Sequence, residues 1–388
     1  MKENKSANII NYFKTIEDPR MERNKLHNLW DILVITICAV VCGCETWEDI
    51  EMYGKEKKDW LRRFLRLPNG IPSHDTIRRV FIRLNPEELA ASFTRWVEAV
   101  RQETKGEIVS IDGKAARRSY DRITGKGPLT MVSAWAHENR VVLGQVKSED
   151  HSNEITAIPR LLEVLELKGC IVTIDAIGCQ HGIATAIQEK KAEYVLAVKG
   201  NQPKLQEEIQ WFFDDIDEDT DRAEGLVDYH KTVDKDHGRI EIREYMISEE
   251  IDWLLPTLKD WKGVRSIGMV RSKRIIGKKE TCEHRYYISS LPQNAEVFGK
   301  AVRAHWGVEN SLHWVLDMVF REDESRMRMG NSPENFAVLR RIALNLVRRD
   351  TQSKFSLKAR RKAAGWSNTY LEKLLFATDD AFERPASS

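Results

Sequence analysis

The chain has 388 residues, of which 41% are hydrophobic and 31% charged, a composition typical of a globular protein. This length allows one large domain with an accessory one. The longest apolar run, Ile32 to Gly43, is too short to cross a membrane, and the N-terminus lacks the order of a signal peptide. The six cysteines lack metal-ligand spacings, which favours buried free thiols over disulfides or zinc. We therefore expect a cytoplasmic protein.

The net charge of +1 conceals a strong segregation of charge along the chain. Residues 55–83 hold nine Lys or Arg against three acids, and residues 340–362 hold nine against one. Residues 207–228 reverse this balance, with ten acids and one Arg, and we interpret most of them as a solvated loop. Segregated basic blocks favour a polyanionic partner, which an even distribution of charge would not suggest.

An all-α N-terminal domain is predicted over residues 1–104. Four helices are expected. Asp31 caps the first, the second runs from Thr46 to Leu67, Ser73 or Asp75 caps the third, and the fourth runs from Pro86 to Val100. The third of these helices carries Arg78, Arg79 and Arg83. A helix, a short turn and a basic helix are the outline of a helix-turn-helix that binds DNA. A small helical bundle with a solvated basic face is an equally good interpretation.

A mixed α/β domain is predicted over residues 105–330. Its core strands are expected at 108–112, 129–136, 141–147, 170–175 and 194–198, with helices at 154–167 and 182–190. A β-rich insertion is expected at about 200–285, with a helix at 205–213 and strands at 240–247, 264–271 and 285–290. Helical periodicity returns from Ala295 to Val319, and a basic helical C-terminal segment covers 331–388.

Two predicted strands end on carboxylates. Ile108, Val109 and Ile111 lead into Asp112, and a similar β-branched run leads into Asp175. An acid at the end of a buried strand is costly unless a metal ion or a cation pairs with it. For Asp112 the alternative is an Asp-Gly hairpin turn. Two strands of one sheet can place both acids at one edge, and such oxygen-rich sites suit Mg²⁺ or Mn²⁺.

A third acid is expected from a helix. His305, Glu309 and His313 have the i, i+4, i+8 spacing that aligns them on one helical face. Zinc is an alternative for this face, but the His-Glu-x-x-His order is absent. The competing acids at 322–324 are expected to form local ion pairs with the nearby arginines at 326 and 328.

Several motifs, in order along nearly the whole chain, resemble one known group. They are Ser110-Ile-Asp-Gly-Lys114, Asn153-Glu-Ile-Thr-Ala157, Thr173-Ile-Asp-Ala-Ile-Gly-Cys-Gln180, Val198-Lys-Gly-Asn-Gln202, His237-Gly-Arg239, Arg285-Tyr-Tyr-Ile-Ser-Ser290 and His305-Trp-Gly-Val-Glu-Asn310. The group is the DDE transposases of the ISAs-type insertion sequences, which include the H-repeat-associated proteins. The stretch from Gly70 to Thr76 resembles that group's associated N-terminal domain.

The resemblance implies an RNase H-like catalytic core whose Asp-Asp-Glu metal site falls on Asp112, Asp175 and Glu309. The spacings are 175 − 112 = 63 and 309 − 175 = 134 residues. Two Mg²⁺ or Mn²⁺ ions about 4 Å apart would then support in-line displacement at a phosphodiester. The implied partners are the double-stranded DNA of the element's ends and its target, with a homodimer acting on two ends. One departure is visible: the superfamily's Tyr, Arg and Lys around the Glu are replaced here by Val302, His305 and Leu316.

Candidate phosphate contacts come from several parts of the chain, and for each the alternative is an ordinary surface cation. They are Lys114, Lys199, Arg239, Arg303 and His305 near the acids, the three arginines at 78, 79 and 83, and Arg340, Arg341, Arg348 and Arg349 of the C-terminal segment, with Trp366 as a stacking group. Two other functions stay open: a domesticated or degenerate relative that binds DNA without transposing, and a metal-dependent nuclease of the same fold.

Overall fold

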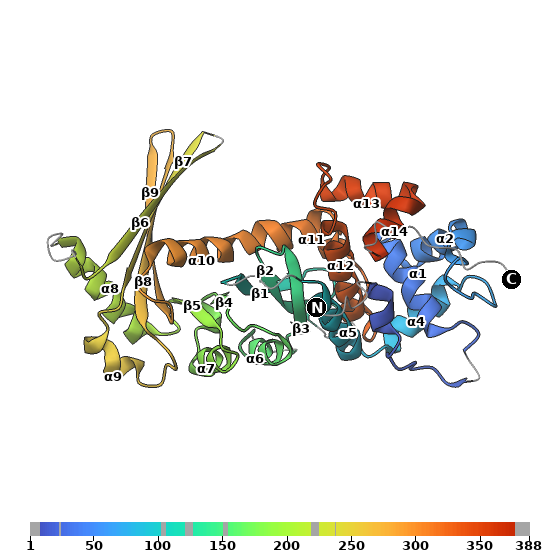
Figure 1. The fold of residues 1–388 in the computed structure, drawn as a ribbon, viewed down its shortest axis with the longest axis horizontal. Coiled ribbons are helices and arrows are strands. Elements are labelled where there is room, and N and C mark those ends of the chain that lie inside the picture. Colours follow the sequence, from blue (N-terminus) through green and yellow to red (C-terminus); the bar gives the residue numbers. More distant parts are fainter. Residues whose placement is uncertain are drawn as a thin grey trace, which may run out of the picture.

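The computed structural model describes residues 8–22, 25–101, 106–120, 127–149, 154–218, 225–236 and 238–376. The molecule is elongated, with a helical body at one end, a central sheet, and long strands at the other end (Figure 1). One hydrophobic cluster runs from the helical body into the central sheet. Among the described residues, no helix is both long and apolar enough to cross a membrane.

The N-terminal segment is helical, as predicted. Its elements are η1 (Ile9–Phe13), α1 (Leu29–Val41), α2 (Trp47–Glu56), α3 (Lys58–Leu61), α4 (His74–Arg83) and α5 (Pro86–Val100). The helix predicted from 46 to 67 is therefore interrupted, and Asn28, not Asp31, caps α1. Asp31 lies buried in the first turn, where its carboxylate accepts a hydrogen bond from the backbone of Leu67. Ser73 caps α4, which confirms one of the two predicted caps.

The C-terminal helices pack against the N-terminal ones. They are α12 (Ser332–Arg348), α13 (Leu357–Trp366) and α14 (Asn368–Phe376). The side-chain amide of Asn335 on α12 donates hydrogen bonds of 2.9 Å to the carbonyl of Phe81 and to that of Leu84. Arg361 on α13 donates to the carbonyl of Val40 at 2.9 Å. The two segments that the sequence places at opposite ends of the chain thus form one helical body (Figure 1).

The described strands form one nine-stranded sheet with the order β3-β2-β1-β4-β5-β9-β8-β7-β6. The first five in the chain are β1 (Ile108–Ala116), β2 (Leu129–Ala136), β3 (Val141–Lys147), β4 (Ile171–Ile174) and β5 (Glu193–Val198). β1 lies antiparallel to β2 and parallel to β4, and β4 lies parallel to β5. All five strands predicted for the core are confirmed, although β1 is longer than expected.

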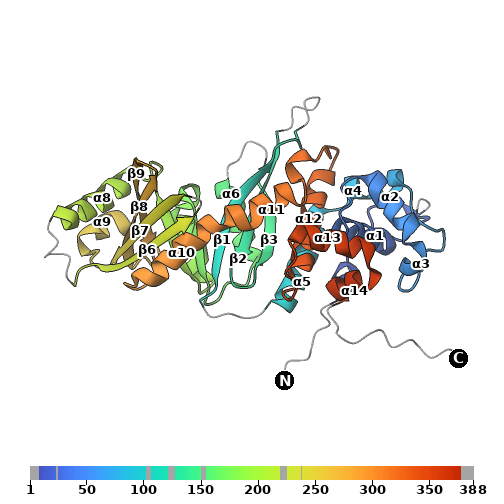
Figure 2. The same cartoon turned by 90° about the horizontal axis from the view of Figure 1, so that it is seen from above.

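Helices cover both faces of this central region (Figures 1 and 2). On one face lie α6 (Glu154–Val164) and α7 (His181–Glu189), and η3 (Ala176–Gly178) follows β4 directly. Across the other face runs a nearly continuous helix made of α10 (Ala295–Val308), the π-helical turn η5 (Glu309–His313) and α11 (Trp314–Met318). A short turn, η6 (Glu322–Glu324), follows.

The segment predicted to be β-rich is so between β5 and α10, but one of its strands was missed. It contains α8 (Pro203–Glu218), β6 (Asp228–Asp236), β7 (Arg239–Ser248), η4 (Asp252–Leu254), α9 (Leu255–Leu258), β8 (Ser266–Ile276) and β9 (Lys279–Ser289). Cross-strand ion pairs stabilise the outer halves of these strands, for example Lys273 with Glu280 at 2.6 Å. Because these halves bury little apolar surface, β6 lacks the alternation by which a strand is recognised.

Candidate active site

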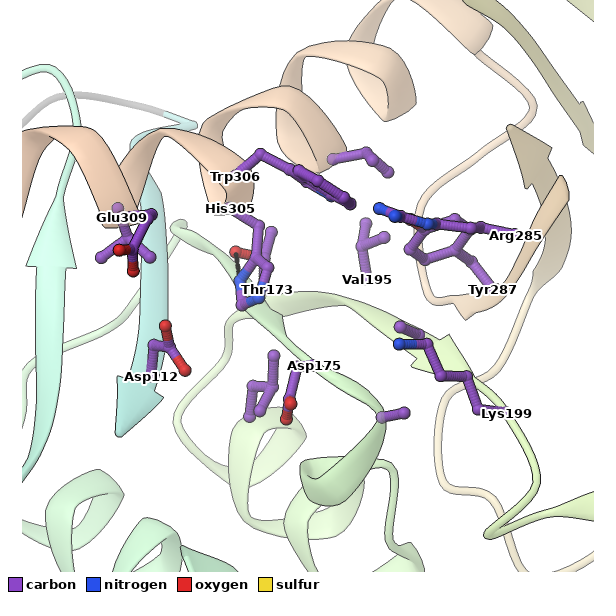
Figure 3. Close-up of a pocket in the computed structure, with 15 residues that line it drawn as sticks. Asp112, Thr173, Asp175, Val195, Lys199, Arg285, Tyr287, His305, Trp306 and Glu309 are labelled. Atoms are coloured by element: carbon purple, nitrogen blue, oxygen red, sulfur yellow. Dashed lines mark hydrogen bonds between the residues drawn. The ribbon is translucent and has the colours of Figure 1, made fainter. Parts of the chain in front are cut away.

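Asp112 and Asp175 lie at the same place in the sheet because their strands are parallel and in register. Ile111 of β1 pairs with Ile174 of β4, and each aspartate is the next residue. β1 continues beyond Asp112, and Gly113 pairs with Val132 of β2. The alternative of an Asp-Gly turn is therefore wrong. Figure 3 shows the Asp112 carboxylate below Glu309, whereas the Asp175 carboxylate points away from α10, where it accepts a hydrogen bond from the Ile177 backbone.

Glu309 approaches these two acids from the helix across the sheet. It begins the π-helical turn η5, a rare geometry that is common at functional sites. Its carboxylate is 72% exposed and lies 3.1 Å from Nδ1 of His313. The same nitrogen lies 3.7 Å from Oδ2 of Asp112. Burial lowers the pKa of His313, so at neutral pH an uncharged imidazole links the helix-borne acid to the strand-borne one.

A chain of hydrogen bonds lies behind the acids. Nδ1 of His305 is 3.2 Å from the hydroxyl of Thr173, which is 2.9 Å from the hydroxyl of Ser110. Burial is the main cause that lowers the pKa of His305. This hydrogen bond positions α10 over β4. Because the imidazole of His305 is neutral, it is a weaker contact for a phosphate than the predicted lysines and arginines.

The electrostatics around Asp112 are unusual for a carboxylate. Burial, reinforced by the negative charges of Glu154, Asp175 and Glu309, raises its pKa from 3.8 to about 7, against a hydrogen bond from the Gly113 backbone that lowers it. Burial and the charge of Asp175 also raise the pKa of Glu154. Asp175 caps η3 through a 3.1 Å bond from the Ile177 backbone. Several like charges thus share one partly buried site, which is an arrangement that a cation stabilises.

These acids fit a hard divalent cation in donor type, since the facing groups are carboxylate oxygens. As the side chains stand, no three metal-ligating groups among the described residues lie close enough to share one ion. Of the three acids, Glu309 is the exposed one, and its side chain would have to leave His313 in order to move closer to the other two.

Glu154 is the site residue that sequence reasoning missed. It begins α6, on the other face of the sheet. After burial, the negative charge of Glu154 is the largest cause of the raised pKa of Asp112. Its only signal was its place in the Asn153–Ala157 motif, to which no role was attached.

A cavity of about 300 Å³ opens beside the acids (Figure 3). Its lining includes all three predicted acids together with Lys199, Arg285 and Trp306. The guanidinium of Arg285 lies 3.6 Å from the centre of the Trp306 ring, which is 46% exposed. Sequence reasoning gave no role to Arg285 or Trp306, although both belong to motifs of the resemblance.

A second cavity of about 360 Å³ continues along the insertion and α10, and it shares Arg285 and Trp306 with the first. Two of the predicted cations, Arg239 and Arg303, line it. Its charged lining residues are Arg239, Arg243, Lys273, Arg274, Arg285 and Arg303, against Glu241 and Glu283. The excess of cations makes this cavity suited to an anion.

Lys114 does not face this space. It is nearly buried on β1, with its ammonium 2.8 Å from Asp317 and 3.3 Å from Asp323. It therefore ties the strand of Asp112 to the segment that follows Glu309, and its predicted contact with phosphate is corrected to this structural one.

The acids at 322–324 form ion pairs, as predicted, but with other partners than Arg326 and Arg328. Glu322 pairs with Arg341 at 2.9 Å, where both side chains are almost fully buried. Asp323 pairs with Lys114 and Glu324 with Arg321.

Burial likewise corrects the interpretation of the basic C-terminal segment. Arg341 is buried in its pair with Glu322, and Arg340 is buried over the ring of Phe336. DNA cannot reach either guanidinium. Arg348 is half-buried and stacks on an aromatic ring, as does the half-buried Arg349. These α12 arginines were counted as basic surface because sequence alone does not show that α12 is central.

The three arginines of α4 differ in exposure. Arg79 and Arg83 are exposed, whereas Arg78 is half-buried and donates to the sulfur of Met329. The apolar face of α4 is buried, and Phe81 stacks on Trp47 at 5.4 Å. This helix therefore belongs to the helical body and presents a basic edge to solvent.

Two family models together match most of the chain. The family model "DDE_Tnp_1-associated" matches residues 10–97, and "Transposase DDE domain" matches residues 97–346. "Putative transposase YncI" of Escherichia coli O157:H7 is 41% identical over 95% of this chain and 94% of its own. "H repeat-associated putative transposase YhhI" of Escherichia coli K12 is 38% identical over 95% and 97%.

A shorter relative, "Inactive transposase YbfQ" of Escherichia coli K12, is 44% identical over 19% of this chain and 86% of its own. Among solved structures, a piggyBac transposase synaptic complex with hairpin DNA aligns with a TM-score of 0.40 and 12% identity, covering 99% of this chain and 79% of the other. The family model that covers residues 97–346, together with relatives matched over almost their full length, shows that this chain belongs to the family of transposases with a DDE domain.

Proposed function

We propose that this chain is a DNA transposase that cleaves DNA at the ends of an insertion sequence and joins those ends to a target. One observation carries the proposal: two strand-borne carboxylates, Asp112 and Asp175, and the helix-borne Glu309 surround one cavity in a chain of this family. We assign these three residues as the ligands of Mg²⁺ or Mn²⁺ and propose that two ions bind.

The proposed core is RNase H-like and consists of β1 to β5 with α6, α7 and α10. Support comes from its mixed strand order, in which β1 lies between an antiparallel and a parallel neighbour. The strands β6 to β9 are then an insertion that extends the same sheet before the helix of Glu309. The helical body, which the described parts of residues 1–104 and 331–388 form, is proposed to contact DNA outside the catalytic core.

The chain's own residues have distinct roles in this mechanism. Bound at the carboxylates, divalent ions would activate a water or a 3′-hydroxyl and stabilise the leaving oxygen in an in-line displacement. Asp112 and Asp175 are fixed by their strands, which suits them to hold such charge in place. His313 restrains Glu309 through its neutral Nδ1–H, and His305 anchors α10 to β4.

DNA is proposed to run from the acids along the two cavities. Lys199, Arg239 and Arg303 are suited to contact phosphates, and Trp306 with its stacked Arg285 is suited to contact an unpaired base. The exposed Arg79 and Arg83 of α4 and the exposed Lys358 and Lys362 of α13 offer further phosphate contacts. Because two ends must be processed together, we propose that a homodimer assembles on DNA.

The test is an in vitro reaction with the element's inverted repeats, comparing the wild type with Glu309→Gln. Glu296→Gln is the matched control, since Glu296 is also an exposed acid on this long helix. We expect cleaved and joined products from the wild type and the control, and neither from Glu309→Gln. Cleavage without joining would instead favour a nuclease.

The alternative is a relative that binds DNA without cutting it. One observation favours it: two positions that carry Tyr and Lys in the superfamily hold the apolar Val302 and Leu316 here, and both are buried. Salt-sensitive DNA binding by the wild type, with no cleavage in Mg²⁺ or Mn²⁺, would support this alternative.

A further inference from the structure

Glu154 lies against the strand that carries Asp112. A Cβ built on Gly113 would overlap the Glu154 carboxylate, with Oε2 2.9 Å away and the other atoms nearer still. Gly113 sits within β1 and is not among the glycines with a left-handed backbone. The backbone therefore does not require glycine there. What glycine provides is room for a carboxylate beside Asp112.

The Glu154 side chain reaches this place from the face of the sheet opposite Glu309. α6 covers one face of the sheet and α10 the other (Figures 1 and 2). Glu154 stands at the start of α6, and Glu309 directly follows α10. Acids from both sides of the sheet therefore converge on the residue pair Asp112 and Gly113.

No cation or hydrogen-bond donor neutralises Glu154 within the described residues. Glu322 differs in both respects: it is almost fully buried and has the guanidinium of Arg341 at 2.9 Å, whereas Glu154 is half-buried and has no such partner among the described residues. Packing an uncompensated carboxylate beside Asp112 is unfavourable unless a cation arrives. A purely structural acid in this place would be expected to have a partner of the kind that Glu322 has.

We propose that Glu154 is a fourth carboxylate of the divalent-metal site, which holds the ion bound at Asp112 either directly or through a bound water. This inference rests on the proposed function. It adds a residue, on a separate element, to the three acids that the family resemblance implies. Gly113 is the positioning partner, since its missing side chain lets the carboxylate approach.

The test measures Mn²⁺ binding by the full-length protein, without DNA, by isothermal titration calorimetry and by electron paramagnetic resonance of free Mn²⁺. The variants are Glu154→Gln, which removes only the charge, and Gly113→Ala, which displaces the carboxylate. Glu163→Gln is the matched control, because Glu163 is an exposed acid on the same helix α6. Melting temperatures in EDTA report on folding separately.

We expect Glu154→Gln and Gly113→Ala to weaken Mn²⁺ binding by about 10- to 100-fold, as loss of a supporting group at a metal site does, while Glu163→Gln binds normally. In EDTA, Glu154→Gln should melt no lower than the wild type, because it relieves repulsion.

If Glu154→Gln and Gly113→Ala both bound Mn²⁺ with wild-type affinity and stoichiometry while Asp112→Asn lost Mn²⁺ binding, the proposal for Glu154 would be wrong and the proposed function would stand. A Glu154→Gln protein that melts lower in EDTA but binds Mn²⁺ normally would also overturn the proposal for Glu154, since the role would be structural. If the wild type bound no Mn²⁺, or Asp112→Asn bound it unchanged, the proposed function would fail together with this inference.

Discussion

Replacing Asp112 with asparagine should stabilise the metal-free protein at pH 8. Asparagine has nearly the same shape but carries no charge, so it removes the repulsion with Glu154, Asp175 and Glu309. It also removes the cost of keeping a charge in a partly buried place, where the side chain is 26% exposed. A substitution in an active site would thus raise stability while it abolishes function.

The magnitude follows from the pKa of Asp112. A rise from 3.8 to about 7 in the folded protein is roughly three units, which corresponds to about 4 kcal/mol as an upper bound. Since the folded pKa is the higher one, the folded state holds the proton more tightly. Wild-type stability therefore falls as pH rises from about 4 to about 7 and is then level, as far as this group contributes. Because the neighbouring acids titrate together, the measured change belongs to the cluster.

Thermal melting in EDTA between pH 4 and pH 8 measures this effect. Asp112→Asn should melt several degrees above the wild type at pH 8, and the difference should vanish near pH 4. Asp260→Asn serves as the control, because Asp260 is an exposed aspartate that lines neither cavity. Mn²⁺ should raise the melting temperature of the wild type but not of Asp112→Asn. An Asp112→Asn protein that melts at or below the wild type at pH 8 would refute the electrostatic reasoning.

Three further predictions concern other parts of the molecule. Glu322→Gln should lower the free energy of unfolding by about 3–5 kcal/mol in urea titrations, because it leaves the buried guanidinium of Arg341 without a counter-charge. The double variant with Arg341→Met should recover part of this loss, and no recovery would contradict the pairing. Trp306→Ala should weaken binding of a single-stranded DNA end by about 1–3 kcal/mol in fluorescence anisotropy, with the duplex affected less, and equal losses for both would argue against base stacking. Gly268→Ala should cost about 1–3 kcal/mol of stability, since its Cβ would lie 2.5 Å from the ring of Phe298, and an unchanged melting curve would show that this contact relaxes freely.

The core of the fold and the meeting of three acids at one cavity could be predicted from the sequence. β-branched runs ending on Asp112 and Asp175 predict adjacent strands, and the structure pairs these strands in register. The helical spacing of Glu309 and His313 predicts their contact, which is formed at 3.1 Å although the turn there is π-helical. These features were visible because the hydrophobic pattern and the chemistry lie in the same short segments.

Other features depend on packing between distant segments, which local sequence does not encode. Arg341 looks like part of a basic surface until α12 is found in the middle of the helical body. Glu154 looks like an ordinary acid in the first turn of a helix, where the helix dipole favours it. Only the position of α6 against β1 shows that its carboxylate lies beside Gly113.

The central claim is that the strand-borne acids are metal ligands in DNA cleavage, and Asp175→Cys tests it most directly. A thiolate is a softer ligand than a carboxylate, so it should support Mg²⁺ poorly and Mn²⁺ better. We predict that Asp175→Cys does not cleave the element's ends in Mg²⁺ but regains cleavage in Mn²⁺, whereas Asp175→Ala is inactive in both. Equal cleavage by Asp175→Cys and the wild type in Mg²⁺, or cleavage by Asp175→Ala in either metal, would contradict the account.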